Sequence, residues 1–278
     1  MINQPNKILN VRERKAIIKN KKYWASRTAE TQLNITAKSI KETELQLQAY
    51  YSNTQNKVIG QFEKIYNKVI SSIGEGEEPT PADLYKLDTY WKMQAQLTAE
   101  LRKLGDNQAA LFSKKFVAQW QNIYDALALK GERAFNTVDK RLVEQMINQI
   151  WCADGKSWSS RVWTNTARLQ ETLNEALIYC VAAGKKPTEL KDLLQERFKV
   201  SYSAADALVR TEMAHIQTQA AKKRYEDYGI QQVEILADED ERRCEICGKL
   251  HEKRYYIGAE VPVPAHPRCR CCIVPVVD

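Results

Sequence analysis

The sequence predicts a mainly α-helical protein, an elongated helical body that ends in a small C-terminal β module. Three observations indicate this fold class. Glycine and proline number only 10 and 8 in 278 residues, so long stretches contain no helix breaker. Apolar residues recur at mixed spacings of three and four through residues 7–73, as on one face of a helix. After Gly229 the pattern changes to short β-branched and aromatic runs with cysteines between them.

The helical body is expected to contain several helices divided by a few breaks. The clearest break is at residues 74–81, where Thr80 is a candidate N-cap and Pro81 the first helical residue. A helix then runs to about Leu104, with Gly105 as its C-cap. Further helices are expected at 107–130, 132–150, 158–183, 187–198 and from Ser201 or Ser203 to Gly229.

Three short strands are expected near the C-terminus, at 232–236, 254–257 and 273–277. The sequence therefore divides into a basic helical region at 1–74, a second helical region at 80–154 and a C-terminal region at 155–278. The β module is the last part of that region, from about residue 230.

The positive charge is concentrated in the first quarter of the chain. Residues 1–74 hold 13 Lys and Arg against 5 Asp and Glu, whereas the whole chain has a formal net charge of +7. Such an excess suits a polyanionic partner such as nucleic acid, and a solvated lysine-rich helix face is the plain alternative. The candidate phosphate-binding residues are Arg12, Arg14, Lys15, Lys19, Lys21, Lys22 and Arg27.

Membrane insertion and export are not expected. The sequence contains no run of 18 apolar residues, and its first fifteen residues lack the apolar core of a secretory signal. We therefore expect a soluble protein made in the cytosol, with no membrane partner.

Five cysteines and one histidine in the β module have the spacing of a metal site. They are Cys244 and Cys247, then, after eighteen residues, His266, Cys269, Cys271 and Cys272. A C-x₂-C pair lets two thiolates bind one ion, and Gly248 is expected to permit the tight turn after it. A second cluster about twenty residues later, with strands between, is typical of a zinc ribbon. Because thiolate-rich sites favour zinc, we predict a structural Zn²⁺ in a zinc-ribbon-like module.

The ligands of this site are expected to come from five residues. They are Cys244, Cys247, His266, Cys269 and Cys271. The C-x₂-C pair and Cys269 are the firmest candidates, and the fourth ligand is His266 or Cys271. Pro267 stiffens the link between the histidine and Cys269, which favours the histidine. The remaining cysteines, Cys152, Cys180 and Cys272, are interpreted as core residues.

Two other interpretations of the cysteines are weaker. A disulfide cluster requires an oxidising compartment, and nothing in the sequence predicts export. A catalytic thiol requires one cysteine activated by a base, which does not explain five cysteines close together.

The C-terminal region also resembles a known family. The similar features are Arg210-Thr211-Glu212 on a helix, Asp238 or Asp240, the Cys244/Cys247 pair, the ending from Pro264 to Cys271, and the stretch at 155–169. Together they resemble the Mu-F-like phage head morphogenesis proteins, also called minor head proteins, over residues 155–278. The family often has an aspartate and a glycine in the loop where this chain has His251 and Glu252.

The resemblance implies a non-enzymatic minor component of a virion. Such proteins are attached to the portal protein inside the head and are linked to head assembly and to DNA packaging or delivery. The implied partners are the portal protein, packaged double-stranded DNA and a scaffold or major capsid protein. The implied location is the inside of the capsid, after assembly in the host cytoplasm. Arg210 and Glu212 are expected to act as a structural clamp between their helix and the zinc module.

Two alternatives from other functional classes remain. A zinc-dependent nuclease would use His251 or His266 with Asp238 or Asp240, although no motif in the sequence requires this. A cytoplasmic DNA-binding factor unconnected with virions would also explain the basic first quarter.

Overall fold

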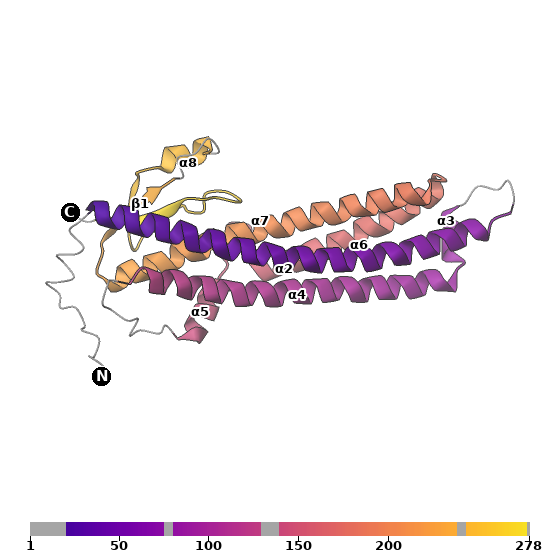
Figure 1. The fold of residues 1–278 in the computed structure, drawn as a ribbon, viewed down its shortest axis with the longest axis horizontal. Helices are drawn as coiled ribbons and strands as arrows, with labels where there is room; N and C mark the ends of the chain where they lie inside the picture. Colours follow the sequence, from indigo (N-terminus) through magenta and orange to yellow (C-terminus); the bar gives the residue numbers. More distant parts are fainter. Residues whose placement is uncertain (1–20, 75–79, 129–138, 238–242, 277–278) are drawn as a thin grey trace, which may run out of the picture. The chain divides into compact units, whose positions relative to one another are not determined.

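The fold was obtained as a computed structural model that describes residues 21–74, 80–128, 139–237 and 243–276. It is mainly α-helical, as predicted, with one small sheet near the C-terminus (Figure 1). The helices before the sheet are α2 (Lys21–Ser71), α3 (Pro81–Tyr85), α4 (Asp88–Ala126), α5 (Lys140–Ile147), α6 (Trp158–Ala182) and α7 (Pro187–Asp227). Within the described residues, no helix has the length and apolar character needed to cross a membrane.

The chain forms two compact units that interleave along the sequence. Unit 1 takes residues 1–43, 113–151 and 207–278, and unit 2 takes residues 44–112 and 152–206. The helices α2, α4 and α7 therefore each contribute to both units. These two units do not coincide with the three consecutive regions expected from the sequence. The division into those three regions stays a prediction.

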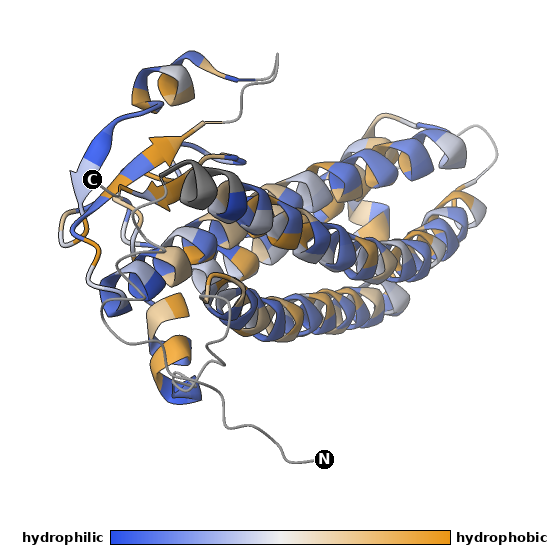
Figure 2. Ribbon diagram, turned by 60° about the vertical axis from the view of Figure 1, so that its left-hand side comes forward, coloured by the Kyte–Doolittle hydropathy of each residue, from blue (hydrophilic) through white to orange (hydrophobic). Residues whose placement is uncertain are grey.

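Unit 2 is an all-helical bundle with an apolar interior. The helices carry alternating hydrophobic and hydrophilic stripes, as expected for amphipathic segments (Figure 2). Its fully buried side chains include Leu47, Phe62, Leu97, Phe112, Leu173, Leu194 and Phe198. Burial of one such side chain contributes about 1.5–3 kcal/mol, so this interior accounts for much of the stability of the unit.

The predicted C-cap at Gly105 is wrong, because α4 continues through this residue to Ala126. A Cβ at position 105 would lie only 2.6 Å from Cζ3 of Trp163 on α6. The glycine therefore permits the indole ring of α6 to approach the backbone of α4. Glycine is favoured both where two helices pack closely and where a helix ends, so the sequence alone does not distinguish these two roles.

The predicted break before Ser201 is also wrong, because α7 is continuous from Pro187 to Asp227. Ser201 is a buried residue in the interior of the helix. Its Oγ forms a hydrogen bond with Tyr51 Oη at 3.0 Å, and its carbonyl oxygen accepts from Asn165 Nδ2 at 2.9 Å. A serine in this position pairs with polar side chains of neighbouring helices instead of capping a helix.

Other predicted helix ends are confirmed. Thr80 precedes α3, and its backbone N–H donates to the Asp83 carboxylate at 3.0 Å. Helix α6 ends just before Gly184, which has φ +56°, and α7 ends just before Gly229, which has φ +70°. Both glycines adopt the left-handed conformation that stops a helix at low cost.

The three predicted strands form an antiparallel sheet in unit 1. They are β1 (Gln232–Leu236), β2 (Arg254–Tyr256) and β3 (Cys272–Pro275), in the order β2-β1-β3. Ile235 of β1 lies opposite Ile273 of β3, and both are fully buried. All four residues of β3 are buried, whereas the outer strand β2 is largely exposed.

A short helix, α8 (Glu245–Leu250), lies between β1 and β2 and was not expected from the sequence. The loop after it includes Glu252, whose φ of +61° is in the left-handed region. The Glu252 amide donates to Ile235 O at 2.8 Å, which ties the loop to the central strand. The Mu-F-like family often has a glycine in this loop, and glycine adopts positive φ without strain.

The inward face of α2 differs between the two units. From residue 27 to residue 43 the buried positions are all polar, namely Thr28, Gln32, Thr36 and Thr43. From residue 47 to residue 69 the buried positions are almost all apolar or aromatic. The first stretch, residues 28–43, is called the polar segment of α2 below.

The polar segment packs through hydrogen bonds to three other elements of unit 1. Gln32 Nε2 donates to Ile273 O of β3 at 2.9 Å. Thr36 Oγ1 donates to Gln217 Oε1 of α7 at 2.5 Å and accepts from Gln119 Nε2 of α4 at 2.6 Å. The Oε1 atoms of Gln32 and Gln119 are buried with no hydrogen-bond partner among the described residues. A buried hydrogen bond contributes about 1 kcal/mol net, and an unpartnered buried polar atom costs about 1–3 kcal/mol.

We therefore predict that the polar segment opens more readily than the rest of α2. Water can replace its hydrogen bonds on opening, whereas exposure of the apolar face at residues 47–69 has no such compensation. In native-state hydrogen exchange, amides of residues 30–43 should exchange as one block, at least about tenfold faster than those of 47–69, since about 1.4 kcal/mol corresponds to tenfold. Uniform protection along α2, or a smooth gradient from residue 21 as in simple fraying, would contradict this.

Candidate metal centre

The first half of the cysteine cluster is built on the start of α8. Cys244 is the N-cap of this helix, and its Sγ accepts a hydrogen bond from Cys247 N at 3.4 Å. The expected tight turn at Gly248 is not formed, because Gly248 lies inside α8 and donates to Cys244 O at 2.9 Å. A Cβ at position 248 would meet only Arg243 Nε, at 3.9 Å, so the backbone does not require glycine there. The helical turn itself brings the two thiols together.

The second half of the cluster is a turn from His266 to Cys269. The Cys269 amide donates to His266 O at 3.2 Å, which closes the turn. Pro267 occupies the second position, and Arg268 occupies the third with φ +61°. These are the features of a type II turn, in which the third residue needs positive φ and is usually glycine. The turn places its first and last residues, both predicted ligands, on the same side.

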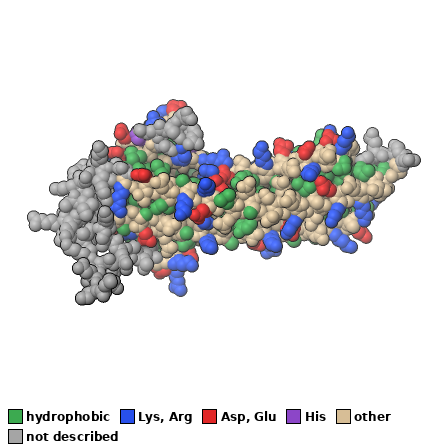
Figure 3. Space-filling view, in the orientation of Figure 1, with side chains coloured by type: hydrophobic (Ala, Val, Ile, Leu, Met, Phe, Trp, Pro, Cys, Tyr) green, Lys and Arg blue, Asp and Glu red, His purple; other side chains and the backbone are tan. Residues whose placement is uncertain are grey.

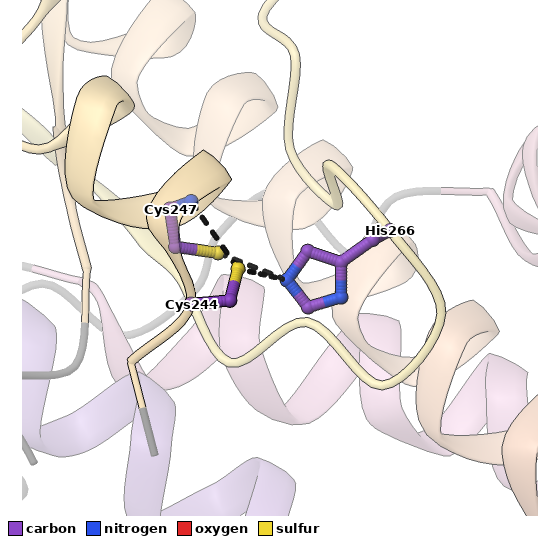
Figure 4. Close-up of side chains that lie close together, drawn as sticks. All are labelled: Cys244, Cys247 and His266. Atoms are coloured by element: carbon purple, nitrogen blue, oxygen red, sulfur yellow. Dashed lines mark hydrogen bonds between the residues drawn. The ribbon is translucent and has the colours of Figure 1, made fainter. Parts of the chain in front are cut away.

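The two halves meet at the His266 ring, which points between the two thiols of the first half (Figure 4). His266 Nε2 lies 3.2 Å from Cys244 Sγ and 3.0 Å from Cys247 Sγ. Cys247 Sγ lies 3.8 Å from Cys269 Sγ. Two thiolates on one tetrahedral zinc, with Zn–S bonds of about 2.3 Å, would lie about 3.8 Å apart. The spacing of Cys247 and Cys269 therefore fits two thiolate ligands of one metal ion.

All five predicted ligands lie in this cluster, in two overlapping groups. Ligand atoms of Cys244, Cys247 and His266 lie within 4.8 Å of one another, as do those of Cys247, Cys269 and Cys271. Cys247 is common to both groups. The donor set of thiols and one imidazole suits a soft or borderline cation and does not suit Mg²⁺ or Ca²⁺.

The four thiols have opposed pKa shifts. The hydrogen bond from the Cys247 amide lowers the pKa of Cys244, and the hydrogen bond with Cys271 lowers the pKa of Cys269. Burial raises the pKa of Cys247, and hydrogen bonding with Cys269 raises the pKa of Cys271. Metal ligation requires thiolates, so a bound cation would have to displace the protons that burial and these hydrogen bonds hold on Cys247 and Cys271.

Helix α7 contacts the turn from His266 to Cys269 through Thr211, a contact that was not expected from the sequence. Thr211 Oγ1 accepts a hydrogen bond from the Arg268 amide at 3.1 Å. Of the two predicted clamp residues, Glu212 is buried and its Oε2 accepts from Trp151 Nε1 at 3.1 Å, and Arg210 is half-buried. The only sequence signal for Thr211 was its position between these two residues.

The other two histidines have separate places in unit 1. His215 stacks on Trp151 with ring centroids 4.2 Å apart and planes 5° apart, and burial lowers its pKa to about 4. His251 Nδ1 accepts a hydrogen bond from the Ala237 amide at 3.2 Å. Both side chains therefore have contacts that fix their position within the fold.

Some predicted residues lie outside the described part of the chain. They are Arg12, Arg14, Lys15, Lys19, Asp238 and Asp240. Lys21 and Lys22 begin α2, but only their backbone is described. Arg27 Nη2 donates to Ala128 O at 2.6 Å. On the face shown in Figure 3, basic and acidic side chains are interspersed along the helices. DNA contact by the basic residues stays a prediction.

Comparison with known proteins identifies the region around the metal centre. No curated protein and no solved structure matches the chain. Residues 171–274, which run from within α6 to within β3 and contain all five predicted ligands, match the family described as phage Mu protein F like protein. The resemblance seen in the sequence is therefore confirmed: this part of the chain is similar to the Mu-F-like phage head morphogenesis family.

Proposed function

We propose that the chain is a minor head protein that is attached to the portal protein inside a phage head and acts in head assembly and DNA packaging or delivery. The observation that carries this proposal is the family match over residues 171–274, which ends within the last strand of the C-terminal β module. A scaffold or major capsid protein is a further candidate partner during assembly in the host cytoplasm.

Within this proposal, Zn²⁺ has a structural role. Cys244, Cys247, Cys269 and His266 would hold it, with Cys271 as the alternative to the histidine. This choice is supported by the short distances from His266 Nε2 to the first two thiols. A bound zinc ion would join the α8 loop to the turn before β3, two segments that the sheet alone links weakly. Structural zinc contributes about 10–16 kcal/mol in small peptides, enough to determine whether such a module folds.

The contacts of the histidines favour this structural role over a nuclease. The chain has three histidines. His266 lies among the thiols, His215 stacks on Trp151, and His251 accepts a backbone hydrogen bond. A general base needs a nitrogen that reaches a substrate, and each of these rings has a contact within the fold. We therefore propose that the protein is not an enzyme.

The proposal includes contact with packaged double-stranded DNA. This contact rests on the excess of basic residues in residues 1–74. Arg27 bonds a carbonyl oxygen of unit 1, so the proposed phosphate contacts fall mainly on the basic residues before it. Contacts of this kind would be independent of base sequence and weakened by salt.

Purified protein should contain about one zinc ion per chain, and Cys247→Ser should release it, since this thiol belongs to both ligand groups. The variant should lose the sheet while most of the helical circular dichroism remains, because the site lies in one small part of unit 1. Cys180→Ser is the matched control, because Cys180 is also buried but lies in α6 of unit 2. Equal zinc content in the two variants, or intact disulfides with no metal, would contradict the assignment.

The proposed function predicts that virions of the encoding phage contain this chain in far fewer copies than the major capsid protein. Crosslinking of intact virions should join it to the portal protein, and residues before about 30 should crosslink to DNA. Mass spectrometry of purified virions and of crosslinked peptides measures both. Presence in infected cells with absence from virions would favour the cytoplasmic DNA-binding factor. Metal-dependent DNA cleavage that His251→Ala abolishes in a folded protein would favour the nuclease.

A further inference from the structure

The turn that carries two predicted ligands has a conformation that needs support. Arg268, between His266 and Cys269, has φ +61° without being glycine. Residues other than glycine, asparagine and aspartate are uncommon in this left-handed region, because their Cβ atom clashes with the backbone. Such a conformation persists where the surroundings determine it.

Thr211 supplies one such support from α7. Its hydroxyl donates to Ala207 O, one turn earlier in the helix, at 2.6 Å. With its only proton used in this way, the oxygen presents its lone pairs and accepts the Arg268 amide at 3.1 Å. The direction of the hydrogen bond is therefore set by the helix, and a group that can only donate could not replace the threonine oxygen.

The amide that Thr211 holds is close to the metal-binding atoms along the chain. It belongs to the residue just before Cys269, and the Cys269 amide in turn donates to His266 O at 3.2 Å. Fixing the peptide plane between Pro267 and Arg268 therefore orients the whole turn, and with it a thiol and an imidazole. Residues that orient metal ligands in this way commonly change metal affinity although they do not touch the metal.

We propose that Thr211 is a positioning residue of the metal centre, which holds the His266–Cys269 turn in its ligating conformation from α7. This inference rests on the proposed metal binding. In this proposal, α7 contacts the metal centre through the hydroxyl of Thr211, the middle residue of the Arg-Thr-Glu motif. The proposal also makes metal affinity depend on the docking of the module onto this helix.

The test compares metal affinity in full-length variants, with Co²⁺ titration followed by its visible spectrum and with Zn²⁺ competition against a chromophoric chelator. Thr211→Val keeps the shape of the side chain and removes the acceptor, and should weaken both affinities by about 10- to 100-fold. Thr211→Ser keeps the hydroxyl and should bind like the wild type. Helical circular dichroism should be the same in all three proteins.

Thr218→Val is the matched control on the same helix. Thr218 is buried, and its hydroxyl donates to Ala214 O at 3.0 Å in the same pattern as Thr211. This variant should bind metal like the wild type, which separates the contact with Arg268 from a general effect on α7. Wild-type affinity in Thr211→Val, or an equal loss in Thr218→Val or Thr211→Ser, would overturn the inference. A wild-type protein that binds neither ion would instead overturn the proposed metal centre itself.

Discussion

The convergence of thiols and one imidazole between α8 and the turn before β3 is the constraint on which the C-terminal module depends. The sheet has three short strands, and its outer strand β2 is largely exposed. A module of this size buries too little apolar surface to hold its loops by packing alone. The candidate ligands bring together two segments that the sheet does not connect directly, with His266 Nε2 within 3.2 Å of the Cys244 and Cys247 thiols at the start of α8.

The module is also anchored to the helices of unit 1 through polar contacts. The Ile273 carbonyl, on the outer edge of β3, accepts from Gln32 of α2 and from Tyr225 of α7. Thr211 of α7 accepts from the amide of Arg268. These hydrogen bonds are directional, so they fix the position of the module more sharply than apolar packing would. Strand β3, which follows the candidate metal ligands, is thereby linked both to α7 and to the polar segment of α2.

The sequence predicted the features that local chemistry determines. The strands, the clustering of the five candidate ligands and the helix ends at Gly184 and Gly229 follow from side-chain pattern, residue spacing and backbone freedom. The errors arose where tertiary packing decides. Gly105 accommodates the ring of Trp163, and Ser201 pairs with neighbouring helices, so neither ends a helix. The role of Thr211 could not be predicted because its partner is distant in the sequence.

Zinc K-edge X-ray absorption of the purified full-length protein measures the atoms around a bound metal, and so tests whether the thiols and the imidazole ligate zinc together. Ligation by three cysteines and one histidine predicts about three sulfur atoms at ~2.3 Å and one nitrogen at ~2.0–2.1 Å. Four sulfur atoms would contradict the assignment of His266 in favour of Cys271. A shell of oxygen and nitrogen alone would contradict the metal centre as a whole.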